Sequence, residues 1–199
     1  MEIWSNTDYP YECLLDFKRT RAFRAAIRAV VKQGAIVLDA GAGSGILSFL
    51  AAQAGARKVY AVEVDSFLAS CLARSIRANN LSHVIEVIRG DIRLAELPER
   101  ADVLICEMME TGLMDEMQVT AINALYERNV ITAETRLIPF RYETFIELGF
   151  TSFNYYGFKI FRRSTTGRIT PVGRMAGCRP SSTRSPLHTV SARLIFNGR

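Results

Sequence analysis

The chain has 199 residues, 49% of them hydrophobic, and 25 Lys and Arg against 20 Asp and Glu. This length suits one full domain and part of a second. Its apolar runs are far shorter than the ~20 residues that a membrane helix needs, and the N-terminus lacks a signal-peptide pattern. Four scattered cysteines and two histidines, with no CxxC pair, argue against disulfides and a metal centre. The composition predicts a cytoplasmic protein with no metal and no membrane partner.

The formal net charge of +5 is unevenly distributed. Residues 157–199 hold nine Lys or Arg and no Asp or Glu, whereas residues 1–156 hold 16 basic and 20 acidic side chains. Such asymmetry can indicate a nucleic-acid surface. The simpler interpretation, which we favour, is a basic edge that faces solvent or lacks its acidic counterpart. RNA therefore stays an alternative partner.

Hydrophobic periodicity predicts alternating helices and strands over the first half of the chain. Gly34 ends the first helix, and Ser66 is the expected N-cap of a later one. The predicted helices cover 12–33, 45–54 and 66–79, and the predicted strands cover 35–38, 59–62, 84–88 and 103–106. This alternation is typical of βαβ units, so we expect an α/β fold with a mostly parallel sheet.

The pattern changes near Pro139. Further strands are predicted at 142–150, 158–161 and 190–196, which indicates an antiparallel β region. Asn197-Gly198 is a hairpin-turn signal with no strand after it. We therefore expect the sequence to be a fragment, or a natural truncation, of a longer protein.

A glycine-rich loop, Asp39-Ala40-Gly41-Ala42-Gly43-Ser44-Gly45, follows the first predicted strand and opens a helix. Glycines allow a tight turn and a close approach of a ligand to the backbone. A dinucleotide loop needs G-x-G-x-x-G, but Ile46 occupies the place of the third glycine. Asp39 would repel a pyrophosphate and suits the cationic amino acid end of S-adenosylmethionine. The loop therefore predicts an S-adenosylmethionine site that includes Gly41, Gly43 and Gly45.

Two more acidic residues end the next two predicted strands. Glu63 lies 18 residues after Gly45, where a carboxylate accepts hydrogen bonds from both ribose hydroxyls. Asp91 can accept from the adenine amino group, and Ile92 can pack on the ring. Capping or surface solvation is the alternative for Asp39 and Glu63, but their order and spacing favour ligand binding.

Residues 14–148 resemble the catalytic core of protein arginine methyltransferases. The resemblance is strongest in VLDAGAGSGILSFLAAQAGARKVYAVE (37–63) and NLSHVIEVIRGDIRLAELP (80–98). It implies a class I methyltransferase with a Rossmann-like core, an N-terminal helical segment and a partial C-terminal β-barrel or sandwich. The corresponding ranges are 1–33, 34–138 and 139–199. Family members dimerise through an arm that we do not find before residue 199, so the oligomeric state stays open.

The resemblance also implies roles for three charged side chains. Arg19 falls where the family has an arginine that pairs with the cofactor carboxylate; a surface charge on a helix is the alternative. Glu107 and Glu116 keep the nine-residue spacing of two glutamates in the family's substrate loop. Two carboxylates would grip a planar guanidinium and aim one nitrogen at the sulfonium methyl. The alternative for Glu116 is a first-turn acid of the following helix.

The chain also departs from the family pattern. Its substrate loop reads Met108-Met109-Glu110-Thr111 in place of Trp-Met-Gly-Tyr, and Asp91 replaces a basic residue. We therefore interpret it as a prokaryotic-type relative that methylates a protein arginine or a similar cationic nitrogen. The alternatives are an RNA or small-molecule methyltransferase, and a cofactor-binding domain left inactive by truncation.

Overall fold

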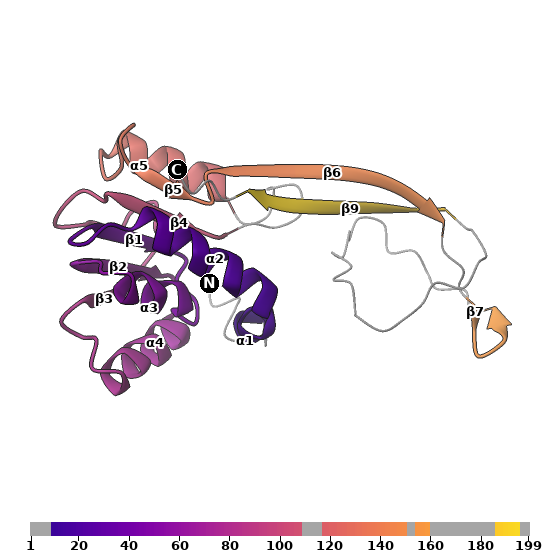
Figure 1. Cartoon of the computed structure of the whole chain (residues 1–199), viewed down its shortest axis with the longest axis horizontal. Coiled ribbons are helices and arrows are strands. Elements are labelled where there is room, and N and C mark those ends of the chain that lie inside the picture. Colours follow the sequence, from indigo (N-terminus) through magenta and orange to yellow (C-terminus); the bar gives the residue numbers. More distant parts are fainter. Residues whose placement is uncertain (1–8, 109–116, 151–153, 160–185, 196–199) are drawn as a thin grey trace. The chain divides into compact units, whose positions relative to one another are not determined.

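The structure is a computed structural model that describes residues 9–108, 117–150, 154–159 and 186–195. Its contacts divide the chain into two compact units, residues 1–141 with 195–199, and residues 142–194. The predicted segments 1–33 and 34–138 both fall in the first unit. Figure 1 shows the chain coloured along its sequence.

The first unit is built on a five-stranded sheet in the order β3-β2-β1-β4-β5. Every neighbouring pair in it is parallel, so the predicted α/β fold with a parallel sheet is confirmed. The strand at 136–138 is not among the predicted elements. The strands are β1 (Ile36–Ala40), β2 (Lys58–Glu63), β3 (Ile85–Arg89), β4 (Val103–Cys106) and β5 (Arg136–Ile138).

The central strands are buried on both faces, which explains their unbroken apolar runs. Leu38 and Leu104 are fully buried in a cluster that includes Ala121 and Leu125 of α5 (Gln118–Glu127). On the opposite face of β1, α3 (Ile46–Gln53) packs on the sheet, and α2 (Phe17–Val30) packs on α3. Within the described residues, no helix is long and apolar enough to cross a membrane.

The predicted helix over 12–33 is wrong in one respect, because the structure divides it at Asp16. The two pieces are α1 (Tyr9–Leu15) and α2. The Asp16 carboxylate accepts a hydrogen bond from the backbone N–H of Arg19 (2.9 Å) and so caps α2. The break gives Arg19 a fixed place in the first turn of α2.

The predicted N-cap of α4 (Ser66–Ala78) is also displaced by one residue. Asp65, not Ser66, has the extended backbone of an N-cap. Its carboxylate accepts from the N–H groups of Phe67 (2.9 Å) and Leu68 (3.1 Å). Only Val64 separates Asp65 from the end of β2, so the cap fixes the direction in which the chain leaves the sheet.

The second unit contains two small sheets in its described part. β7 (Asn154–Tyr155) and β8 (Phe158–Lys159) pair in antiparallel fashion. β6 (Arg141–Phe150) pairs with β9 (Pro186–Ile195), and their arrows in Figure 1 run in opposite directions. The predicted change from parallel to antiparallel strands after Pro139 is thus observed.

We expect Asp65→Ala to lower the free energy of unfolding by about 1 kcal/mol, because two N–H groups of α4 lose their acceptor. Urea denaturation monitored by circular dichroism measures the change. Asp65→Asn, which keeps an acceptor oxygen, is the matched control and should retain most of the stability. Equal losses in the two variants would contradict the capping role.

Candidate functional site

The strand order places a crevice at the carboxyl ends of β1 and β4. These strands are neighbours, yet the chain continues from β1 to β2 on one side and from β4 to β5 on the other. Such a reversal is where open α/β sheets bind ligands. A cavity of about 620 Å³ lies here. Its lining includes Arg19, Gly41, Gly43, Glu63, Asp91, Ile92, Glu107 and Met108.

The glycine loop is shaped by backbone conformations that favour glycine. Gly41 and Gly43 have φ angles of 72° and 53°. The N–H groups of Gly41 and Ala42 donate to the carbonyl oxygen of Val62 (3.0 and 2.9 Å), which fastens the loop to β2. A Cβ atom on Gly43 would meet nothing within 4 Å. The backbone at Gly43 therefore borders open space in the cavity lining.

Gly45 has a different structural role. It has a φ angle of 79° and is the N-cap of α3. A Cβ atom there would lie 2.1 Å from Cδ1 of Leu72 in α4, and Gly45 does not line the cavity. The third glycine of the loop thus permits close packing of α3 on Leu72.

Asp39 lies behind the glycine loop and not in the cavity lining. It is 1% exposed, and its carboxylate accepts a hydrogen bond from the hydroxyl of Ser48 (2.6 Å) in α3. Burial raises the pKa of Asp39 to about 6, opposed by the hydrogen bonds from Ser48. The structure gives Asp39 a contact that joins β1 to α3.

Glu63 bridges the loop and the start of α4. One carboxylate oxygen accepts from the N–H of Gly43 (2.7 Å) and the other from the N–H of Asp65 (2.9 Å). Burial raises the pKa of Glu63, and these backbone hydrogen bonds act in the opposite direction. Each oxygen keeps a lone pair, so the carboxylate can also accept from a ligand in the cavity.

Arg19 and Glu107 form an ion pair in the cavity wall. Nε of Arg19 donates to Oε1 of Glu107 (3.1 Å), and Nη2 donates to Oε2. The two side chains are 16% and 21% exposed, and the Arg19 guanidinium lies 5.2 Å from the ring centre of Phe23. Burial raises the pKa of Glu107, while Arg19 lowers it. The carboxylate at the end of β4 therefore binds a guanidinium through two parallel hydrogen bonds.

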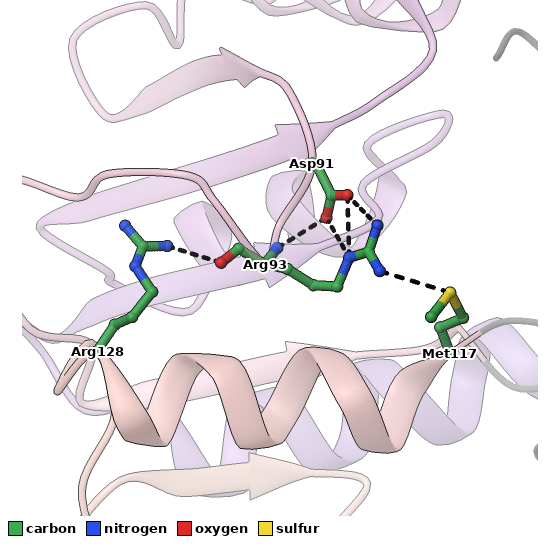
Figure 2. Close-up of polar contacts among 4 residues, drawn as sticks. All are labelled: Asp91, Arg93, Met117 and Arg128. Carbon is green, nitrogen blue, oxygen red and sulfur yellow. Dashed lines mark hydrogen bonds and ion pairs between the residues drawn. The ribbon is translucent and has the colours of Figure 1, made fainter.

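Asp91 pairs with an arginine that the sequence analysis did not single out. The backbone N–H of Arg93 donates to Oδ1 of Asp91 (2.9 Å), and the Arg93 guanidinium binds both carboxylate oxygens (Figure 2). The hydrogen bonds from Arg93 lower the pKa of Asp91. The sequence signal for this ion pair is an aspartate followed two positions later by an arginine.

The structure thus brings most of the predicted site residues to one cavity. Asp39 and Gly45 lie behind it, and Glu116 lies outside the described residues. Ser48 and Arg93 are contributors that the sequence analysis did not predict. Whether the predicted residues bind a ligand stays a prediction.

Comparisons with known proteins identify the family. The family described as the TRM5/TYW2 methyltransferase domain matches residues 17–137, more than half of the chain. The chain belongs to this family. The match runs from the start of α2 into β5, and it includes every lining residue of the cavity except Pro10 and Cys13.

Similar curated proteins include arginine methyltransferases. Histone-arginine methyltransferase CARMER of Drosophila persimilis is 50% identical over 126 residues, which are 62% of this chain and 23% of that protein. An uncharacterized protein of Methanocaldococcus jannaschii is 38% identical over 138 residues, 69% of this chain and 52% of that protein. The chain therefore spans about half, or less, of the length of these relatives.

Solved structures show the same relationship. The Trypanosoma brucei PRMT1 enzyme-prozyme complex with AdoHcy has a TM-score of 0.64 and 29% identity, over 75% of this chain and 50% of that one. Arabidopsis thaliana protein arginine methyltransferase 10 has a TM-score of 0.61 and 35% identity, over 71% of this chain and 40% of that one. The resemblance to arginine methyltransferases and the Rossmann-like fold are confirmed.

The raised pKa of Asp39 predicts a pH-dependent stability. Between about pH 4 and 6 the folded chain holds a proton that the unfolded chain releases, so stability falls as pH rises through this range. The loss is roughly 3 kcal/mol, because the pKa of Asp39 is raised from 3.8 to about 6. The side chain of Asp39→Asn cannot ionise. The free energy of unfolding of the variant minus that of the parent chain should therefore increase by that amount as pH rises from about 4 to 8.

Urea denaturation of both proteins from pH 4 to 8 measures this difference. Other groups titrate in the same range, and those that do not interact with Asp39 contribute equally in the two proteins and cancel. A difference that does not change with pH would contradict the burial-induced shift at Asp39.

Proposed function

We propose that this chain carries the cofactor site of an S-adenosylmethionine-dependent methyltransferase that methylates a guanidinium nitrogen of a protein arginine. The observation that carries this proposal is Glu107. Glu107 directly follows β4 and lines the cavity, and its two carboxylate oxygens bind the guanidinium of Arg19. The membership in a methyltransferase family and the arginine methyltransferases among its relatives support the proposal.

The residues of the cavity fit S-adenosylmethionine. Its volume of about 620 Å³ suits a ligand of this size. The open side of Gly43 leaves room beside the loop, and Glu63 retains acceptor capacity for ribose hydroxyls. Asp91 and Ile92 are available to the adenine, and Arg19 is a cation for the amino acid carboxylate. When bound, this cofactor supplies an electrophilic methyl group on a sulfonium.

The chain's own residues would contribute position and charge. Glu107 holds the guanidinium plane and draws positive charge toward the nitrogens that it binds, which leaves electron density on the reacting nitrogen. For Glu107 to hold a substrate guanidinium, Arg19 must share or release it. The role of Glu116 as a second carboxylate, the protein substrate and a cytoplasmic location remain parts of this proposal.

We expect Gly43→Arg to abolish cofactor binding, because the side chain would extend into the cavity space beside the loop. Isothermal titration calorimetry with S-adenosylhomocysteine measures the affinity. Gly43→Ala is the matched control, because it has the same backbone strain of roughly 1–2 kcal/mol without the long side chain. Unchanged affinity in the arginine variant would reject the site assignment.

We expect Glu107→Gln to retain cofactor binding and to lower turnover by about 100-fold or more. The reason is that the neutral amide lacks the negative charge with which the carboxylate binds a guanidinium. Tritiated methyl transfer to arginine-rich peptides measures turnover. Glu99→Gln is the control, since Glu99 pairs with Arg57 and does not line the cavity. Full activity in the Glu107 variant would contradict the carboxylate role.

The same tritium assay on cell extract identifies the acceptor. Protease-sensitive label that hydrolyses to methylarginine supports the proposal. Nuclease-sensitive label would instead indicate RNA methylation. The basic segment at 157–199 would then be the candidate RNA-binding segment.

A further inference from the structure

Arg93 contacts three residues of the first unit, namely Asp91, Met117 and Arg128 (Figure 2). Its Nε lies 2.9 and 3.0 Å from the two carboxylate oxygens of Asp91, and Nη2 also binds Oδ2. Its Nη1 lies 3.7 Å from Sδ of Met117, just before α5. Its carbonyl oxygen accepts from Nη1 of Arg128 at the end of the same helix (3.0 Å). Arg93 is therefore held at both its backbone and its side chain.

These contacts fix the direction of the Asp91 carboxylate. The backbone N–H of Arg93 holds Oδ1, and the guanidinium prevents rotation of the second oxygen. The Asp91 side chain is still 29% exposed, and both Asp91 and Arg93 line the cavity. A carboxylate has about four lone-pair directions, so it keeps capacity for a further donor.

We propose that Arg93 is a positioning residue that holds Asp91 as the acceptor for the exocyclic amino group of adenine. This inference rests on the proposed S-adenosylmethionine site. Arginine carries donors only, and the adenine amino group is also a donor, so Arg93 cannot bind that group itself. It acts on adenine through the carboxylate that it orients.

The consequence is selectivity for the 6-amino base. In hypoxanthine a carbonyl oxygen replaces the amino group, so the ligand would present an acceptor to a fixed carboxylate. A site that aims a fixed acceptor at one hydrogen-bond donor of the ligand discriminates against a ligand that presents an acceptor there, because the two acceptors repel each other. A carboxylate free to rotate would turn away and discriminate less.

Calorimetry on the full chain with S-adenosylhomocysteine and its deaminated analogue S-inosylhomocysteine tests this inference. We expect the parent chain to prefer the adenosyl ligand by about tenfold or more. In Arg93→Ala the ratio of the adenosyl affinity to the inosyl affinity should fall toward one, because the adenosyl ligand binds more weakly. The affinity for the inosyl ligand should change less than about twofold. That second affinity also shows that the variant is folded.

Arg57→Ala is the matched control. It removes an arginine from a comparable ion pair with Glu99, 2.7 Å long, whose members do not line the cavity. Its ligand ratio should equal that of the parent chain. If Arg93→Ala keeps the parent ratio, or sharpens it, the positioning role is overturned. If the parent chain binds neither ligand, the proposed cofactor site itself fails, which is a different result.

A pH profile gives a readout that simple destabilisation would not move. Hydrogen bonds from Arg93 hold the pKa of Asp91 below its ordinary value. Without Arg93 the carboxylate should take up a proton at a higher pH, so Arg93→Ala should lose affinity for the adenosyl ligand at a higher pH than the parent chain does. Superimposable pH profiles would overturn the proposal.

Discussion

The two hydrogen bonds of the Glu63 carboxylate are the constraint on which the site depends. One oxygen holds the loop after β1 at Gly43, and the other holds the turn into α4 at Asp65. Asp65 in turn caps α4, which carries Leu72 against Gly45. A single buried carboxylate therefore couples the glycine loop to the packing of the next helix. Its position in the cavity lining means that a bound ligand and the fold would use the same side chain.

Negative charge is concentrated at this end of the sheet. Asp39 is next to last in β1, Glu63 ends β2 and Glu107 directly follows β4. Burial raises the pKa of all three carboxyl groups. Among these three carboxylates, Glu107 pairs with an arginine, Arg19, and the other two accept neutral donors. Such a crevice favours a cation, in agreement with the proposed sulfonium cofactor and the proposed guanidinium substrate.

The sequence predicted the parallel sheet and most of the cavity lining because these depend on local patterns. Buried central strands read as continuous apolar runs, and the glycines mark a turn that few other residues permit. The break at Asp16 was missed because the hydrophobic period of α1 continues into α2. The strand β5 was missed because three residues are too short for a periodic signal.

Side-chain partners were the least predictable part of the site. Arg19 and Glu107 lie 88 residues apart, and Asp39 meets Ser48 only because α3 folds back on β1. A sequence gives the residue type at each strand end but not what lies opposite it. Asp39 was therefore expected in the cavity, although it is bonded behind the loop.

The pairing of β1 with β4 also determines when the site can exist. Ile36 and Asp102, 66 residues apart, exchange hydrogen bonds at the beginning of these neighbouring strands. During synthesis, the glycine loop and Glu63 emerge long before Glu107 does, and contacts between distant segments form late in folding. A nascent chain that stops before β4 would have the loop but no wall opposite it. Ligand binding can therefore stabilise only the completed sheet, not an early intermediate.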